Sequence, residues 1–265
     1  MSNLTFIMEL FDVNQISNGV YCISENYYQS WNKANMFLFV SKNESIIVDT
    51  GTGLYNPVPF LISKGIIQSE PKAAIATHVH YDHAGGHHFF QDFYLHSNDA
   101  EALQTKDELK SLPFIAKCEL TQMPPGFEKY EMKPRQVFEV LEDGMTFKVG
   151  NETLEIIHLP GHTPGSIGVL HQEKKLLCTG DMLFSDFPML DSVSGQGSQS
   201  DFESSMKKIL KLISEEKVFS PYFITNPDLR FWYIFRSTFV CQDMDCLLKV
   251  KRPSLQPRGT WNSVV

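Results

Sequence analysis

Three histidines and one aspartate fall within six consecutive residues of this chain. They stand in the stretch Thr77-His78-Val79-His80-Tyr81-Asp82-His83-Ala84-Gly85-Gly86. Imidazole nitrogen and carboxylate oxygen are ordinary ligands of zinc, and an isolated histidine seldom has such neighbours. The density of these groups predicts a metal site. Its candidate ligands in this stretch are His78, His80, Asp82 and His83.

The sequence on either side predicts how these ligands are positioned. The apolar run Ala73-Ala74-Ile75-Ala76 comes directly before them and predicts a buried strand. Ligands two residues apart can converge from a loop at the end of a strand, whereas within the strand they would alternate between its faces. Gly85 and Gly86 let the chain turn sharply, and we expect a helix over 85–91.

Strands and helices alternate over most of the remaining chain. The expected strands cover 20–23, 36–40, 45–49, 73–76, 93–95, 136–141, 146–149, 153–157, 167–170 and 176–178. The other expected helices cover 57–63, 98–110 and 200–216, the second of them with Asn98 as its N-cap. Two strand-rich halves, each covered by helices, predict an α+β fold.

The motifs and their order resemble those of the metallo-β-lactamase fold hydrolases. His-x-His-x-Asp-His after a buried strand is similar to the signature of that superfamily. Asp49-Thr50-Gly51, Pro160 to Ser166 and Thr179-Gly180-Asp181 resemble three further motifs. The matching region runs from about Gly19 to Phe219. The resemblance implies a four-layer αββα sandwich, here with an atypical C-terminus, and a site for one or two metal ions.

The same resemblance implies a role for individual residues. It places His78, His80 and His162 on the first metal ion, Asp82 and His83 on the second, and Asp181 between the two. The implied metal is zinc. Asp82 would orient or deprotonate the attacking water, and Asp49 would lie behind the ligands and fix their geometry.

One ligand that the superfamily would supply is missing. Its last motif places a histidine after a strand, commonly in a Pro-Gly-His context, but the histidines of this chain end at His171. The segment 217–223 stands where this motif is expected, with Tyr222 at the histidine position. A tyrosine whose pKa is near 10 is a poor zinc ligand at neutral pH. We therefore expect one zinc ion at the first site and a weak or empty second site.

Charge and composition change at the same place. Residues 1–219 carry a formal charge of −11, and residues 220–265 one of +3. The second segment is too short for a comfortable independent domain without a metal or disulfides. We expect a metallo-β-lactamase-like domain over 1–219 and a divergent C-terminal segment over 220–265. Its apolar run 231–240, if unpaired, would favour self-association or contact with a membrane surface.

Composition excludes several classes of protein. A formal charge of −8 without a clustered basic face opposes binding of nucleic acid. Five scattered cysteines without a C-x-x-C pair fit reduced thiols inside a cell. The chain does not open like a secretory signal, and no run reaches the roughly 18 apolar residues of a membrane span. We expect a cytoplasmic protein, with any membrane contact peripheral and on the cytoplasmic side.

The chemistry that follows is hydrolysis by a zinc-bound hydroxide. Zinc lowers the pKa of bound water from 15.7 to about 7 and polarises a bound carbonyl. The segment from Glu25 to Asn35 and the short tail after Asp181 resemble mammalian metallo-β-lactamase domain-containing proteins assigned as acyl-coenzyme A thioesterases. A leaving thiolate, with a pKa of about 8.5 by analogy with cysteine, needs less stabilisation than an amine. We therefore expect a thioesterase that acts on acyl-coenzyme A, with a small-molecule thioester or ester as the substrate.

Three alternatives stay open at this point. The chain could be another zinc hydrolase of the fold, acting on lactones, glutathione thioesters or β-lactams. A mononuclear iron oxygenase would use His78, His162 and Asp181 as a face of two histidines and one carboxylate. A metal-binding protein with impaired catalysis would follow from the missing ligand. Metal content and a hydrolysis assay separate these alternatives.

Other histidines and aromatic residues have simpler interpretations. His171 is expected in an exposed hairpin turn. Tyr27, Tyr28 and Trp31 fit ordinary core packing better than the wall of a pocket. The histidines expected on helix surfaces or behind the ligands are His87, His88 and His96.

Overall fold

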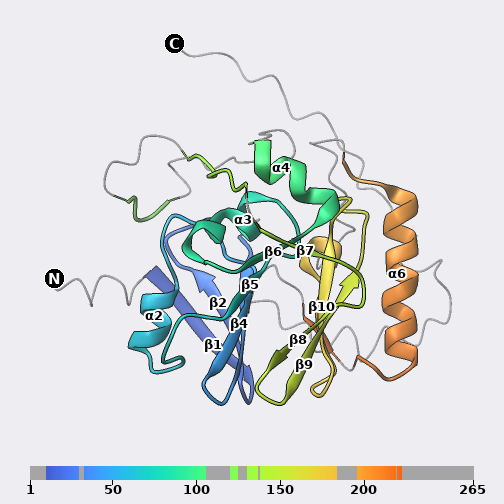
Figure 1. Cartoon of the computed structure of the whole chain (residues 1–265), viewed down its shortest axis with the longest axis horizontal. Coiled ribbons are helices and arrows are strands. Elements are labelled where there is room, and N and C mark those ends of the chain that lie inside the picture. Colours follow the sequence, from blue (N-terminus) through green and yellow to red (C-terminus); the bar gives the residue numbers. More distant parts are fainter. Residues whose placement is uncertain are drawn as a thin grey trace, which may run out of the picture. The chain divides into compact units, whose positions relative to one another are not determined.

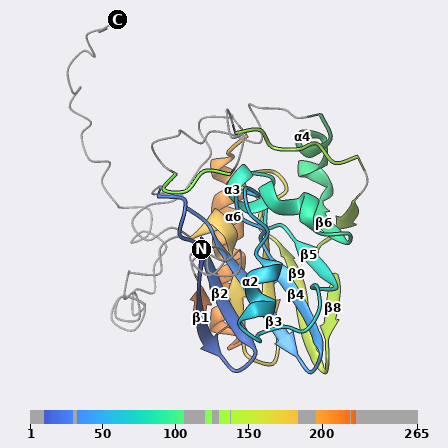
Figure 2. The ribbon, with the colours of Figure 1, turned by 90° about the vertical axis from the view of Figure 1, so that its left-hand side faces the viewer.

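Two β-sheets lie face to face, with helices on their outer sides (Figure 1, Figure 2). The structure is a computed structural model, and it describes residues 10–29, 33–105, 120–124, 130–136, 138–183, 196–218 and 220–222. The predicted apolar run 231–240 and Trp31 lie outside these residues. Within them, helix, sheet, sheet and helix form the four layers of an α+β sandwich, as predicted.

The first sheet has seven strands in the order of the sequence. Its strands are β1 (Phe11–Ser17), β2 (Val20–Glu25), β3 (Asn35–Ser41), β4 (Glu44–Val48), β5 (Ala73–Ile75), β6 (Phe93–His96) and β7 (Glu139–Leu141). The first four form an antiparallel meander, whereas β5, β6 and β7 run parallel to β4. The carboxyl ends of β4, β5 and β6 therefore meet at one edge of the sandwich.

The second sheet has five strands in the order β12-β11-β10-β9-β8. Its strands are β8 (Thr146–Val149), β9 (Glu152–His158), β10 (Ile167–His171), β11 (Leu176–Cys178) and β12 (Ser220–Tyr222). Neighbours are antiparallel except β12, which runs parallel to β11 with Tyr222 opposite Cys178. The sequence analysis did not predict β12 or the edge strand β1.

Helices are short except for the last one. The α-helices are α2 (Val58–Ser63), α3 (Tyr81–Ala84), α4 (Ala100–Thr105) and α6 (Gln199–Ser214), and the 3-10 helices are η1 (Gly85–Phe89), η2 (Ser97–Asp99) and η4 (Gly180–Met182). The helix α6 begins after Ser198, whose hydroxyl accepts a hydrogen bond from the Asp201 amide. None of these helices, within the residues given above, is long and apolar enough to cross a membrane.

Two predicted helices differ from the structure. The segment 85–91 forms the 3-10 helix η1 in place of an α-helix. The helix expected over 98–110 begins only at Ala100 and is described to Thr105. Asn98 is not its N-cap, because it lies within η2 and its side chain donates to Pro164 O across the sandwich. Contacts with the second half of the chain thus decide where this helix starts.

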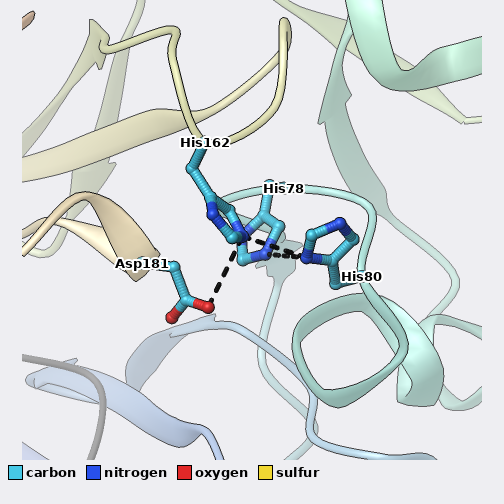
Figure 3. A group of neighbouring side chains, drawn as sticks. All are labelled: His78, His80, His162 and Asp181. Carbon is cyan, nitrogen blue, oxygen red and sulfur yellow. Dashed lines mark hydrogen bonds and ion pairs between the residues drawn. The ribbon is translucent and has the colours of Figure 1, made fainter. Parts of the chain in front are cut away.

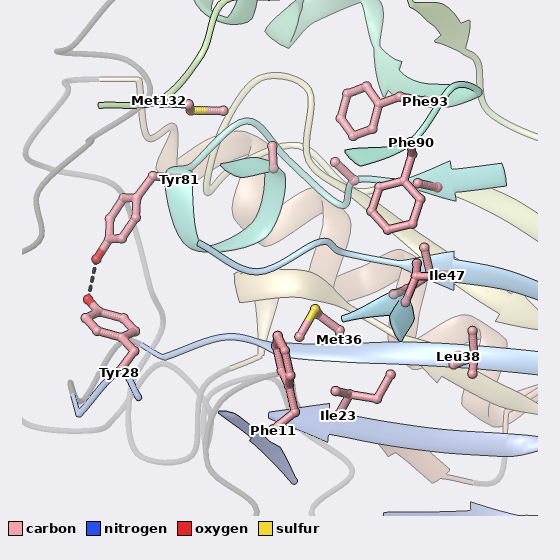
Figure 4. Packing of buried hydrophobic residues seen from close by; sticks show 14 of the residues in the cluster. Phe11, Ile23, Tyr28, Met36, Leu38, Ile47, Tyr81, Phe90, Phe93 and Met132 are labelled. Carbon is pink, nitrogen blue, oxygen red and sulfur yellow. Dashed lines mark hydrogen bonds between the residues drawn. The ribbon is translucent and has the colours of Figure 1, made fainter. Parts of the chain in front are cut away.

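Three apolar layers hold the sandwich together. In β3, Met36 and Leu38 pack beneath the helices on the outer face, whereas Phe37 and Phe39 pack between the sheets. Figure 4 shows the first of these layers, in which Leu38 lies near Ile47. A third layer joins α6 to the outer face of the second sheet. A strand buried on both faces needs a continuous apolar run, which is why β3 and β4 were predictable.

The packing of β4 makes a stability prediction. Ile47 is fully buried opposite Leu38, whereas Ile62 on α2 is 43% exposed. We expect Ile47→Ala to lower the free energy of unfolding by about 2–5 kcal/mol because it leaves a cavity. The matched variant Ile62→Ala should change it by no more than roughly 0.5 kcal/mol. Denaturant titration of both variants measures this, and equal losses would contradict the assignment of the core.

Candidate metal centre

The candidate ligands come from both sheets and meet at one edge of the sandwich. His78 and His80 lie in the loop after β5, and Asp82 and His83 lie in α3 directly behind it. The remaining two, His162 and Asp181, come from the loop between β9 and β10 and from η4 after β11. Six side chains that are spread over more than a hundred residues therefore share one place.

Three imidazole nitrogens converge at this place. His80 Nδ1 lies 3.0 Å from His78 Nε2 and 3.0 Å from His162 Nε2. Asp181 Oδ2 lies 3.5 Å from His162 Nε2. One potential ligand atom from each of these four residues lies within 4.8 Å of the others (Figure 3). We call His78, His80, His162 and Asp181 the four-ligand group.

The spacing within the four-ligand group fits a small cation. Nitrogen ligands at 2.0–2.1 Å in tetrahedral arrangement lie about 3.3–3.4 Å apart, close to the separations seen here. A single proton on His80 Nδ1 can serve only one of its two nitrogen neighbours well. A cation between the rings would accept a lone pair from each of them, so the donor set suits a metal better than a hydrogen-bonded cluster.

The electrostatics of the group keep His78 and Asp181 in the forms that bind metal. Burial, together with the neighbouring His83, His80 and His162, holds the pKa of His78 well below its usual range, so its ring stays neutral. Burial opposes ionisation of Asp181, but the nearby histidines outweigh it and lower the pKa of this carboxyl. Neutral imidazole and ionised carboxylate are the forms that bind metal.

A second group of side chains adjoins the first through Asp181. His83 Nε2 lies 3.3 Å from Asp181 Oδ1 and 3.5 Å from Asp82 Oδ2. Burial raises the pKa of Asp82 to about 6, and the charge of Asp181 adds to this effect. Burial lowers the pKa of His83, but the carboxylates of Asp181, Asp82 and Asp49 raise it well above its usual range. A cation at this second group would compete with that proton.

Asp49 lies behind His83, at the end of β4. Its Oδ2 accepts from His83 Nδ1 at 2.9 Å, and its Oδ1 accepts from the Thr77 amide at 2.7 Å. The residue adopts a φ of 62°, in the left-handed region that aspartate tolerates better than most residues. The bond from Nδ1 turns His83 Nε2 toward Asp82 and Asp181, which is the orientation a ligand needs.

The glycine pair after α3 allows close packing of two backbones. A Cβ on Gly85 would lie 2.4 Å from Thr52 O, and one on Gly86 would lie 2.3 Å from Thr50 O. Gly85 has a φ of −58°, so any residue could adopt its backbone conformation. The two glycines are therefore needed because the backbone of residues 50–53 lies directly against them. They are not needed for the sharp turn that the sequence suggested.

The sequence analysis missed two buried acids near the site, Glu25 and Asp99. Glu25 is 1% exposed at the end of β2, and its Oε1 accepts from the amide and the hydroxyl of Thr52 at 2.9 Å each. It also accepts from Tyr27 OH. Its Oε2 is buried without a hydrogen-bond partner among the described residues. The sequence signal that could have identified Glu25 is its place as a charged residue at the end of an apolar strand.

The other histidines lie away from the four-ligand group. His171 is buried beside Glu152, with Nε2 3.2 Å from a carboxylate oxygen, so the expected exposed turn is wrong. His96 and His158 stack with ring centroids 4.1 Å apart. His87 is buried and donates to Lys133 O. Tyr27 and Tyr28 are fully buried core residues, as expected.

Comparison with known proteins adds the family and the fold. The chain matches the sequence profile described as "Metallo-beta-lactamase superfamily" over residues 30–218. It is 29% identical over 233 residues to "Acyl-coenzyme A thioesterase MBLAC2" of Homo sapiens, covering 82% of this chain and 83% of that protein.

Two solved structures share the fold. A metallo-beta-lactamase from Pontibacter korlensis superposes with a TM-score of 0.60 at 17% identity, over 82% of this chain and 92% of the other. TTHA1623, crystallised in a di-iron-bound form, superposes with a TM-score of 0.55 at 20% identity, over 76% and 86%. At these identities the likeness speaks for the architecture alone.

The burial of Glu25 makes a prediction about pH. Burial raises the pKa of Glu25 to about 7, although its hydrogen bonds to Tyr27 and Thr52 oppose the shift. Between the unfolded pKa near 4.5 and about 7, the folded chain holds a proton that the unfolded chain has lost, so stability falls as pH rises. This one group contributes a slope of at most roughly 1.4 kcal/mol per pH unit.

Glu25→Gln should remove that slope. We expect the difference in unfolding free energy between the variant and the wild type to move in favour of the variant as pH rises from 5 to 8. Denaturant titrations across this range, with both proteins free of metal, measure it. Parallel pH profiles would mean that Glu25 is ionised in the folded chain throughout.

Proposed function

The chain belongs to the metallo-beta-lactamase superfamily, and we propose that it is a zinc-dependent hydrolase that cleaves acyl-coenzyme A thioesters. The observation that carries this proposal is the convergence of three imidazole nitrogens and one carboxylate in the four-ligand group. His78, His80 and His162 would hold the ion, and Asp181 would stand between it and a second position. The similarity to the human thioesterase supports the choice of substrate.

Each side chain has a distinct task in this proposal. When bound, zinc lowers the pKa of water to about 7 and polarises a carbonyl oxygen. Asp82, with a pKa of about 6 and 5% exposure, is largely ionised at neutral pH and can accept a proton from water or orient it. Asp49 holds His83 in place through Nδ1. No separate nucleophile of the protein is needed for hydrolysis by this route.

The choice of a thioester follows from the leaving group. A thiolate with a pKa of about 8.5 departs without being protonated first, whereas an amine does not. Stabilisation of departing charge is the task for which a second ion is most useful. A site with one firm ion therefore suits thioesters better than amides or lactams.

Iron is the second candidate for the metal. His78, His162 and Asp181 belong to the four-ligand group and provide the two histidines and one carboxylate of an iron site. TTHA1623, which shares the fold, has been crystallised with two iron ions. The third nitrogen, from His80, favours zinc, because an iron oxygenase site keeps positions open. Elemental analysis of the purified full chain decides between the two metals.

The first test removes one ligand. We expect His80→Ala to lose its metal and to reduce thioester hydrolysis by more than the 10- to 100-fold that loss of an outer hydrogen bond typically costs. His88→Ala is the matched control and should keep both, because its ring contacts Gly85 O, His87 and Phe89 and belongs to neither group of candidate ligands. Metal content and hydrolysis of an acyl-coenzyme A are measured side by side. Full metal content in His80→Ala would overturn the assignment.

A second test restores the missing ligand. Tyr222 pairs with Cys178 at the end of β11, and Asp181 follows three residues later. We expect Tyr222→His to raise the zinc stoichiometry from about one toward two, with the ions about 3.5–4 Å apart. Hydrolysis should improve more for substrates with poor leaving groups than for thioesters.

The control for this gain is Tyr222→Phe, which removes the hydroxyl without adding a ligand. Zinc titration of wild type and both variants, followed by hydrolysis of a thioester and an amide-like substrate, gives the comparison. If Tyr222→His binds no more zinc than Tyr222→Phe, Tyr222 does not occupy the position of the missing histidine.

A further inference from the structure

We propose that Asp99 is a positioning residue that joins two loops of the proposed metal centre. One is the loop after β5, which carries His78 and His80, and the other is the loop between β9 and β10, which carries His162. The sequence context of Asp99, Ser97-Asn98-Asp99-Ala100, contains no motif that sets it apart. The proposal rests on the proposed metal centre, since it concerns how His80 and His162 are brought to 3.0 Å of one another. The hydrogen bonds of Asp99 go to two backbone amides and one hydroxyl beside these histidines, and the proposed role acts through those groups.

Asp99 bonds to a residue next to a ligand on each loop. Its carboxylate is 1% exposed at the end of η2. Oδ2 accepts from the Val79 amide at 3.0 Å and from Thr163 Oγ1 at 2.8 Å. Val79 separates His78 from His80, and Thr163 directly follows His162. One oxygen atom therefore joins the two loops at the residues that carry the ligands.

The second oxygen of Asp99 bonds to the loop between β9 and β10 at a further residue. Oδ1 accepts from the Gly165 amide at 2.8 Å. A Cβ on Gly165 would lie 2.5 Å from this oxygen, so a glycine is needed for the carboxylate to enter. Thr163 Oγ1 also bonds Ser166 Oγ at 2.9 Å, which holds the hydroxyl in place. The loop between β9 and β10 therefore has a conformation and a glycine that fit the Asp99 carboxylate.

Other contacts between the two loops lie at the strand ends and between the rings themselves. The loops leave different sheets, and the backbone bond from Ile167 to Thr77 O joins them at the strand ends. Beside the candidate ligands, the distance between the two loops would otherwise depend on contacts between the histidine rings. A buried carboxylate that accepts three bonds supplies a fixed link there, independent of whether a cation is bound.

Only a carboxylate satisfies all three donors. Two backbone amides and one hydroxyl point at its two oxygens. In Asp99→Asn, one oxygen becomes an amide nitrogen that faces an N–H group, so at least one buried donor loses its acceptor. The variant keeps the shape of the side chain and changes only this pattern of bonds.

The test measures zinc affinity of the full chain by competition with a chelator. We expect Asp99→Asn to bind zinc about 10- to 100-fold more weakly, the range typical for loss of a bond behind the ligands. The cobalt-substituted protein should show an altered visible spectrum, since the ligand geometry changes. Asp143→Asn is the matched control, because Asp143 accepts from the His158 amide and from Lys208 and touches neither ligand loop.

A purely structural role for Asp99 gives a different result. Asp99→Asn and Asp143→Asn would then both lower the stability of the metal-free chain and leave zinc affinity and the cobalt spectrum unchanged, which overturns the proposal. If Asp99→Asn does not fold, Thr163→Val and Thr163→Ser carry the test. The valine variant loses one bond to Asp99 and should weaken zinc binding, whereas the serine variant keeps the hydroxyl and should restore it.

Failure of the proposed function is distinguishable from failure of this inference. If the wild type binds no zinc, the metal centre is wrong, and hydrogen exchange in the metal-free chain then decides the role of Asp99. Exchange of the Val79 and Gly165 amides should be slow in the wild type and much faster in Asp99→Asn. Equal exchange in both proteins would overturn the positioning role whatever the site binds.

Discussion

One ring nitrogen of His80 lies 3.0 Å from a ring nitrogen of His78 and 3.0 Å from one of His162, and the rest of the structure depends on keeping these three rings together. Lone pairs that point at a common centre repel one another unless a proton or a cation lies between them. The site is also buried: His78 is 1% exposed, and His162 is 3% exposed. The loops that carry these residues therefore have to be held close together by the structure around them.

That constraint explains several features that would otherwise be unrelated. The 50–53 loop packs backbone against backbone on the Gly85–Gly86 pair, and Glu25 fixes that loop from below through Thr52. Asp49 has a left-handed backbone conformation, and its carboxylate accepts hydrogen bonds from His83 and Thr77. Together these contacts fix the position of α3 next to the candidate ligands. Rigid support of this kind is what ligand geometry within a few tenths of an ångström requires.

The sequence predicts those parts of the site that are local. His78, His80, Asp82 and His83 lie within six residues after a strand that is apolar on both faces, so their meeting needs no knowledge of the fold. The partnership of Asp99 with Val79 and Thr163 spans 64 residues from one sheet to the other. No spacing or periodicity encodes such a contact, because it depends on how two sheets stack.

Errors in the predicted elements have the same origin. His171 was placed in an exposed turn because its neighbours are polar, but the other sheet covers it with Phe39. The helix at Ala100 starts late because Asn98 and Asp99 bond across the sandwich instead of capping it. Local propensity is a weak signal where a polar side chain has a better partner elsewhere in the fold.

The two groups of candidate ligands depend on different segments of the chain. The four-ligand group is assembled from the two sheets and from the loops that Asp99 joins, and Asp181 is the last of its residues along the chain. The second group shares Asp181 with the first and adds Asp82 and His83. The backbone of Tyr222 pairs with that of Cys178, which lies three residues before Asp181. The geometry of the second group therefore depends on α3 and on Asp49 as well as on η4, whereas the four-ligand group is set by the loops after β5 and β9 and by η4.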